Sequence, residues 1–179
     1  VGLSKETAHQ LGTPTSSLNA WLAILKQEYP DKKTVLELEK DVNRLEKITE
    51  RFSKIGSKPV LKHTNLNDVI KNSINYLLSR SSDKINFVFD SPDEEIFVPL
   101  NEALFEWVIE NVCKNAMDAM NGKGEIRIKI VDHTQIIYID ILDSGKGLPK
   151  SRFKTIFKPG FTTKKRGWGL GLSLTKRIV

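Results

Sequence analysis

Polar side chains interrupt one face of a long helical segment in the second half of the chain. At helical spacing, Leu104 and Val108 are followed on the same side by Asn111, Asn115 and Asp118. Two amides and a carboxylate at positions where a core face would continue need polar partners. They could cap neighbouring loops, or they could hold Mg²⁺, which binds an amide oxygen together with water and phosphate oxygens.

A first glycine-rich segment, Asp143-Ser-Gly-Lys-Gly, directly follows a predicted strand. Gly145 and Gly147 allow a tight turn and a close approach of the backbone to a flat ligand. Asp143, at the end of the strand, could accept a hydrogen bond from an exocyclic amine. An ordinary turn would explain the same residues equally well.

A second glycine-rich segment, Gly167-Trp-Gly-Leu-Gly-Leu172, opens a predicted helix. Alternating glycines before a helix N-terminus present backbone amides that can bind an anion such as phosphate. The spacing differs from the P-loop, because no Gly-Lys-Ser/Thr follows, and from the dinucleotide-binding fingerprint.

Between the two glycine-rich segments lies Phe157-Lys-Pro-Gly-Phe-Thr-Thr-Lys164, which is long enough to form a lid. The basic residues that end it, Lys164, Lys165 and Arg166, could neutralise phosphate charge or simply face solvent. The sequence therefore predicts a lid and leaves both roles open for its basic residues.

In the first half of the chain, His9 is followed by Gln10 and then by Thr13 and Pro14. On a helix, His9 faces away from the apolar side that carries Leu11, and Thr13 shares its face one turn later. Pro14 removes a backbone donor and bends the helix just beyond the histidine. Most helical histidines are surface or packing residues, but these features together set His9 apart.

Two amphipathic helices, joined by a break at Tyr29-Pro-Asp31, carry this histidine. Each helix has an apolar seam at heptad-like spacing. The seams comprise Leu11, Leu18, Leu22 and Leu25 in the first helix, and Val35, Leu38, Val42, Leu45 and Phe52 in the second. Two helices alone bury too little surface, so the hairpin is expected to dimerise into a four-helix bundle.

Beyond a linker at residues 58–61 the pattern changes. Helices are expected near residues 66–77, with Thr64 or Asn65 as the N-cap, near 101–120, and from about 172 onward. Strands are expected at residues 85–89, 96–98, 125–131 and 135–142. This order predicts an α+β fold class: a helical hairpin followed by an α/β sandwich with a mixed sheet, its helices on one face, and a lid.

Taken together and in this order, Asn-x3-Asn-Ala, Asp-x-Gly-x-Gly, Phe-x-Pro-x-Phe-Thr-Thr-Lys and Gly-x-Gly-x-Gly resemble the ATP-binding superfamily of histidine kinases, gyrase, MutL and chaperone ATPases. The segment around His9 resembles the phosphoacceptor box of sensor histidine kinases. The chain thus resembles the core of a sensor kinase. The resemblance implies a dimerisation and phosphoacceptor hairpin at residues 1–57 and an ATP-binding domain at residues 62–179.

The resemblance implies ATP and Mg²⁺ as cofactors, and transfer of the γ-phosphoryl group first to His9 and then to an aspartate of a response regulator receiver domain. It implies that Asn115 holds Mg²⁺, that Asp143 recognises adenine, and that Gln10 and Thr13 assist at the phosphoacceptor site. The other nucleotide-binding residues that it implies are Asn111, Asp118, Gly145, Gly147, Thr162, Thr163, Lys164, Gly167, Gly169, Leu170, Gly171 and Leu172.

Two departures from the family patterns bear on the chemistry. Gyrase-like ATPases have a water-activating Glu where this chain has Asn111, which favours phosphoryl transfer over hydrolysis. Sensor kinases have an acidic residue where this chain has Gln10, which can orient the imidazole but cannot take its proton, so slow autophosphorylation is expected. The alternatives are an ATP-hydrolysing machine of the gyrase or chaperone type and a catalytically degenerate kinase scaffold.

The composition, 39% hydrophobic and 28% charged, is that of a globular protein. The net charge of +6 is mostly scattered, so no nucleic-acid partner is expected. Cys113 is expected in the core, and His63 and His133 in structural or solvated positions. No stretch approaches the roughly 20 apolar residues of a membrane span.

These features lead us to expect a cytoplasmic catalytic core of a membrane-bound sensor, connected to the membrane only through upstream segments. The chain is expected to be cut at both ends. A truncated ATP-binding domain would lack its last two strands, and a shortened first helix would weaken the homodimer.

Overall fold

The computed structural model describes residues 2–30, 32–56, 59–133, 135–164 and 169–179, and for residues 2–12, 44, 47–48 and 50–56 it describes the backbone alone. The chain divides into two compact units, Val1–Val60 and Leu61–Val179. Among the helices of the described residues, none combines the length and the apolar character needed to cross a bilayer.

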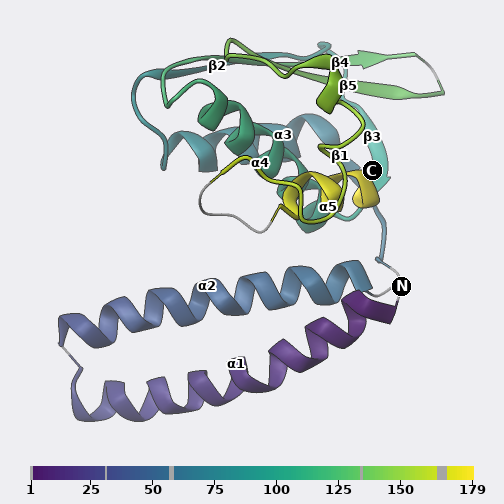
Figure 1. Ribbon diagram of the computed structural model, residues 1–179. Helices are drawn as coiled ribbons and strands as arrows, with labels where there is room; N and C mark the ends of the chain where they lie inside the picture. Colours follow the sequence, from purple (N-terminus) through teal and green to yellow (C-terminus); the bar gives the residue numbers. More distant parts are fainter. Residues whose placement is uncertain (1, 31, 57–58, 134, 165–168) are drawn as a thin grey trace. The chain divides into compact units, whose positions relative to one another are not determined.

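The first unit is a pair of helices, α1 (Gly2–Glu28) and α2 (Lys33–Gly56), which meet at the predicted break (Figure 1). Helix α1 continues through Pro14. The buried core of the pair consists of Leu22, Val35 and Val42, with Leu25 packed against them. These four residues belong to the predicted seams, because the heptad-like spacing brings them to the line along which the two helices touch.

Other residues of the predicted seams are not covered within one chain. Leu18 and Leu38 are each 40% exposed, and Leu45 is 47% exposed. Two helices touch along a single line, so side chains beside that line stay in contact with water. The side chains of Leu11 and Phe52, the two remaining seam positions, lie outside the described residues.

The second unit contains a three-stranded mixed sheet in the order β2-β4-β5, in which β2 runs parallel to β4 and β4 antiparallel to β5. Its strands are β2 (Ile85–Asp90), β4 (Gly124–Asp132) and β5 (Ile137–Asp143). A separate two-stranded sheet pairs β1 (Lys62–Asn65) with β3 (Phe97–Leu100). Strand β1 escaped sequence-based prediction because Lys-His-Thr-Asn contains no apolar residue to alternate.

Helices cover one face of the three-stranded sheet. Figure 1 shows α3 (Leu66–Leu78) and α4 (Glu102–Ala119) along that face. Asn65 caps α3, because its side-chain oxygen accepts a hydrogen bond from the backbone N–H of Asn67 at 3.0 Å. Asn101 caps α4 in the same way, accepting from the N–H of Leu104 at 3.1 Å. The predicted α+β class, with helices on a mixed sheet, is confirmed.

The core between sheet and helices follows from two periodicities. On β4, alternate residues Ile126 and Ile128 are fully buried. On α4, a stripe at helical spacing is buried, formed by Ile109, Cys113, Ala116 and Met120. The polar stripe of α4 begins two residues after Ile109, about 200° around the helix. It instead continues the side of α4 that carries Leu104 and Val108, which are also buried.

Burial makes Cys113 chemically inert in the folded protein. Its side chain is 0% exposed, and this burial raises the pKa of the thiol from 9.0 to about 12. Only the thiolate reacts with alkylating agents. We expect iodoacetamide at pH 8 to leave the native chain unmodified and to label it fully in concentrated urea, which mass spectrometry would show. Rapid labelling of the native chain would contradict this packing of α4.

The same pKa shift has a consequence for stability. The Cys113 thiol keeps its proton to a higher pH in the folded state than in the unfolded state. Its protonation therefore contributes fully to the free energy of unfolding below pH 9, and this contribution is lost as the pH rises from about 9 toward about 12.

Candidate functional site

The polar face of α4 meets a lysine that lies far along the chain. The Nζ atom of Lys164 donates a hydrogen bond to Oδ1 of Asn115 at 2.8 Å and forms an ion pair with the carboxylate of Asp118. The side chains of Lys164 and Asp118 are 42% and 59% exposed. Three residues that the sequence assigned to nucleotide binding thus lie together at an accessible place.

Asn111, one turn before Asn115, faces the start of the last helix, α5 (Gly171–Ile178). A Cβ atom placed on Gly171 would lie 3.4 Å from Oδ1 of Asn111, so the two elements approach closely. The Nδ2 atom of Asn111 is buried and has no hydrogen-bond partner among the described residues. A buried N–H donor without a protein partner needs an acceptor, and a phosphate oxygen or an ordered water could supply it here.

The Asp143 loop packs against the C-terminal end of α4. The backbone N–H of Gly145 donates to Oδ1 of Asp143 at 2.8 Å. A Cβ atom on Gly145 would lie 2.9 Å from the backbone carbon of Ala119, so only glycine fits here. Gly147 has a φ of 66°, in the left-handed region. The two predicted roles of this segment, turn and ligand contact, are compatible, because the second carboxylate oxygen of Asp143 is not used in the turn.

Ser144 is a part of this site that sequence reasoning missed. Its hydroxyl oxygen accepts from the N–H of Glu125 at 3.0 Å, and the hydroxyl lies 3.2 Å from the sulfur of Met120. Ser144 therefore ties the Asp143 loop to the start of β4 and to the end of α4. A signal was present in the sequence, because a serine just after a strand often bonds to nearby backbone.

A short 3₁₀ helix at Lys150–Arg152 precedes the predicted lid, residues 157–164, and the lid is tied to the second glycine-rich segment. The N–H of Gly160 donates to the carbonyl of Gly169 at 3.0 Å. Gly169 has a φ of 65°, and a Cβ atom on it would lie 2.4 Å from the carbonyl carbon of Gly160. Nearby, the Lys176 ammonium lies 5.6 Å from the centre of the Phe157 ring.

The remaining predicted lid and glycine-box residues take less specific positions. The hydroxyl of Thr162 accepts from the N–H of Lys164 at 3.1 Å, and Thr163 is exposed. Leu170 is the N-cap residue of α5, and Leu172 lies in its first turn. Gly167 lies outside the described residues.

Glu110, the carboxylate nearest in sequence to Asn111, belongs to a different environment. Its side chain is 8% exposed, and its Oε2 atom lies 2.8 Å from Nζ of Lys114, which is one turn later on α4. A carboxylate buried and paired in this way is held by its neighbour and is not aimed at the Asn115 face. Glu110 therefore does not supply the water-activating base that Asn111 lacks.

The residues present fit Mg²⁺ as a cofactor. The described residues contain no cluster of three or more His, Cys, Asp or Glu side chains that could hold a metal. Mg²⁺ does not need such a cage, because it is often held by one or two protein oxygens together with substrate phosphates and water. The amide oxygen of Asn115 and the carboxylate of Asp118 already converge on one cation, the Lys164 ammonium.

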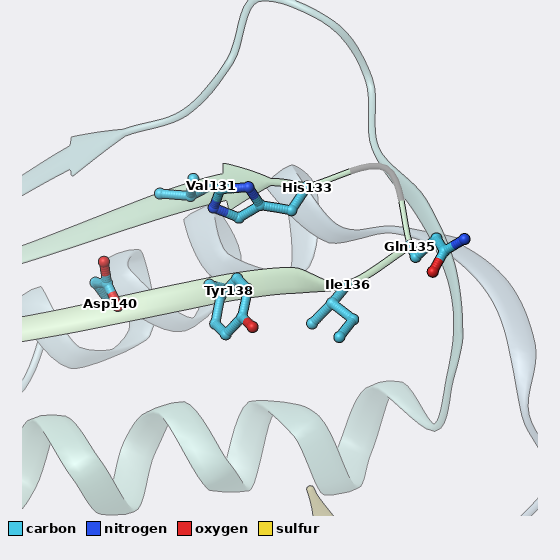
Figure 2. A pocket seen from close by; sticks show the side chains of 6 residues that line it. All are labelled: Val131, His133, Gln135, Ile136, Tyr138 and Asp140. Atoms are coloured by element: carbon cyan, nitrogen blue, oxygen red, sulfur yellow. The ribbon is translucent and has the colours of Figure 1, made fainter.

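A hollow elsewhere on the second unit has no such chemistry. It lies at the turn end of the β4–β5 hairpin, and Figure 2 shows His133 just after β4 and Tyr138 and Asp140 on β5 lining it. The His133 ring meets the Tyr138 ring edge to face, 5.4 Å between centres. Asp143 stands at the opposite end of β5, so this open hollow lies apart from the residues predicted to bind nucleotide. His133 is exposed and touches only the edge of this hairpin's Tyr138 ring among its ring contacts in the described residues, in line with the structural or solvated position expected for it.

The predicted phosphoacceptor residues lie on α1 in the first unit. His9 and Gln10 are in the helix, but their side chains lie outside the described residues. Thr13 is exposed one turn after His9. Helical backbone across this segment keeps the one-turn spacing between His9 and Thr13 that the sequence predicted.

Comparisons with known proteins agree with this architecture. Residues 101–179 match the family described as histidine kinase-, DNA gyrase B-, and HSP90-like ATPase. The chain is 27% identical over 183 residues to sporulation kinase C of Bacillus subtilis, covering 99% of this chain and 42% of that kinase. It therefore spans less than half the length of this relative.

Solved structures give the same result for the fold. The catalytic domain of the histidine kinase ThkA matches with a TM-score of 0.61 and 29% identity, over 66% of this chain and 78% of that one. A structure of ThkA in complex with the response regulator protein TrrA matches in fold, with a TM-score of 0.61 and 24% identity, over 99% of this chain and 53% of that one. Residues 101–179 thus match the model of this ATPase family, and the chain as a whole is similar in sequence and fold to the catalytic cores of sensor histidine kinases.

Proposed function

We propose that the second unit binds Mg-ATP and that the γ-phosphoryl group is transferred to His9, and from there to an aspartate of a response regulator. The observation that carries the nucleotide part is the convergence of Asn115, Asp118 and Lys164 beside the Asp143 loop. The similarity to sporulation kinase C, which extends over both units, supports the histidine acceptor. In domain terms, residues 1–57 act as the phosphoacceptor hairpin and 62–179 as the ATP-binding domain.

Each part of the site has a chemical task in this proposal. Asp143 accepts a hydrogen bond from the exocyclic amine of adenine, and Gly145 lets the loop lie flat against α4. Asn115, assisted by Asp118, would hold Mg²⁺, and the bound ion would supply neutralisation of phosphate charge. Asn111, whose buried Nδ2 atom has no hydrogen-bond partner within the described part of the chain, donates to a phosphate oxygen or to a water molecule beside it.

At the acceptor, a neutral ring nitrogen of His9 forms the new N–P bond while the bond from the γ-phosphorus to the β,γ-bridging oxygen breaks, leaving ADP. Imidazole is largely neutral near pH 7.5, so attack does not require prior deprotonation. The remaining ring proton passes to solvent. Gln10 can orient the ring by accepting a hydrogen bond but cannot take this proton.

Transfer, and not hydrolysis, is favoured by what surrounds Asn111. A gyrase-type ATPase would need a carboxylate to activate water at that position, and Glu110 is buried in an ion pair with Lys114. Without a base, a bound water is a poor nucleophile. This observation separates the kinase from the ATPase alternative within one superfamily.

Partners follow from the same proposal. The structure of ThkA in complex with the response regulator protein TrrA supports a receiver domain as the partner. In this proposal Thr13, exposed on α1, orients water toward a phosphorylated regulator. The exposed seam residues Leu18, Leu38 and Leu45 suit a homodimeric four-helix bundle. As part of a longer sensor, this core would act on the cytoplasmic side of a membrane.

Incubation with γ-labelled ATP and Mg²⁺ tests the proposal. We expect label on the protein that is lost in acid and retained in base, as a phosphorus–nitrogen bond requires, with little release of free phosphate. Steady phosphate release without labelled protein would instead indicate a gyrase-type ATPase. Nucleotide binding with neither labelled protein nor phosphate release would indicate a degenerate scaffold.

A further inference from the structure

The contact between Lys164 and α4 joins parts of the chain that are 49 residues apart, Lys164 and Asn115. Lys164 closes the described part of the lid segment, defined here as residues 150–164. Its ammonium is the only cation of the described residues that touches both Asn115 and Asp118. The ion pair therefore fixes the position of this part of the lid segment relative to the polar face of α4.

Near Lys164, the described residues show one further backbone contact between the lid segment and the second glycine-rich segment. The N–H of Gly160 is bonded to the carbonyl of Gly169 at 3.0 Å, and the N–H of Lys164 to the hydroxyl of Thr162 at 3.1 Å. Between these ties, Phe161 is half-buried. Release of the Lys164 side chain would remove a support of residues 160–164, so the Gly160–Gly169 hydrogen bond beside it would open more often.

The contact is of a kind that exchanges easily. Both charged side chains are about half exposed, and ion pairs in such positions contribute little to stability and are screened by water. The oxygens that Lys164 contacts are also those best suited to Mg²⁺ on this face. Two cations cannot share the Asn115 oxygen without strong mutual repulsion, because they would lie within about 5 Å of each other.

We propose that Lys164 is a latch: without nucleotide its ammonium holds the lid segment to Asn115 and Asp118, and Mg-nucleotide displaces it from both. The displaced ammonium then lies beside the phosphates and can pair with them. Opening of the lid segment is thereby coupled to arrival of the metal-bound nucleotide. This inference rests on the proposed function for its second step, the displacement, but not for its first, the nucleotide-free contact.

Hydrogen exchange on the full chain tests both steps through a double-mutant cycle. The variants are Lys164→Met, Asp118→Asn and the two together, and the measured quantities are the exchange rates of the Gly160 and Phe161 amides. Without nucleotide, each single substitution should raise these rates roughly 2- to 5-fold, and the double variant no further, because both remove one contact. With Mg²⁺ and a saturating non-hydrolysable ATP analogue, this non-additivity should disappear.

A matched control is Lys154→Met. Lys154 is an exposed lysine of the same lid segment, and no side-chain contact ties it to the polar face of α4 within the described residues. Its substitution should leave the rates at Gly160 and Phe161 within experimental error of those of the unsubstituted chain.

The outcomes separate the two claims. Additive effects in the nucleotide-free protein would overturn the latch. Non-additivity that persists unchanged with bound Mg-nucleotide would overturn the displacement step. If the analogue protects no amide anywhere in residues 61–179 of the unsubstituted chain, the proposed function is overturned, and the nucleotide-free cycle still decides whether the contact exists.

Discussion

His9→Ala should abolish the acid-labile label altogether while nucleotide binding to the second unit stays intact. The alanine variant keeps the helix, because alanine has the highest helix propensity, but it removes the nitrogen that forms the new bond to phosphorus. Without the acceptor nitrogen no slower route to a labelled protein remains, so we expect complete loss of the label. The measurement is retention of label from γ-labelled ATP after base treatment.

A second histidine provides the control. His133 lies just after β4, beside Tyr138 and away from the Asp143 loop, so His133→Ala should label as fast as the unsubstituted chain. Acid-labile label on the His9→Ala variant would show that another residue accepts the phosphoryl group, and the central proposal would fall. Loss of label from His133→Ala alone would locate the acceptor on the β4–β5 hairpin.

Asn115→Ala should remove at least about half of the stabilisation that Mg-ATP gives to the second unit. A ligand at 100 times its Kd stabilises a fold by about 2.7 kcal/mol, and a tenfold weaker Kd reduces this to about 1.4 kcal/mol. Loss of the amide oxygen that holds Mg²⁺ is expected to weaken binding by at least about tenfold, because the phosphates then lack charge compensation. Asp143→Ala should reduce the stabilisation by Mg-ATP in the same way, because it removes the proposed hydrogen bond to the exocyclic amine of adenine.

Thermal unfolding with and without Mg-nucleotide measures both variants. The control is Asn72→Ala, which changes an exposed asparagine of α3 and should keep the full nucleotide-dependent shift. An undiminished shift in both Asn115→Ala and Asp143→Ala would remove these residues from the site. A lower melting temperature in the absence of nucleotide would not matter, since only the difference made by the ligand is compared.

Local features of the site could be predicted from the sequence. The polar spacing of Asn111, Asn115 and Asp118 places them on one side of a helix whatever its surroundings. Asp143 ends β5 as the alternating pattern before it predicted. Gly147, predicted to allow a tight turn, adopts the left-handed conformation that favours glycine. Such properties depend on a few residues that are close in sequence, so they can be predicted from local sequence patterns.

Contacts between distant segments could not be predicted. Nothing in the sequence pairs Lys164 with Asn115, since a lysine in a lid can equally face solvent. The ion pair of Glu110 with Lys114 fits helical spacing, but its burial depends on how α4 packs against the rest of the unit. Strand β1 forms only because β3 provides a pairing edge for four polar residues. Each of these depends on tertiary packing, which overrides local preference.

The two glycines of the Asp143 loop are required for different reasons, so the two positions should differ in how readily they are substituted during evolution. Gly147 needs a left-handed backbone, yet a Cβ atom there would meet nothing within 4 Å. Asparagine tolerates that conformation, so position 147 can accept it. At Gly145 a Cβ atom would lie 2.9 Å from the Ala119 backbone itself, which no substitution at position 119 can relieve. A lineage descended from this chain can therefore exchange Gly147 one step at a time, whereas Gly145 can change only if the end of α4 moves with it.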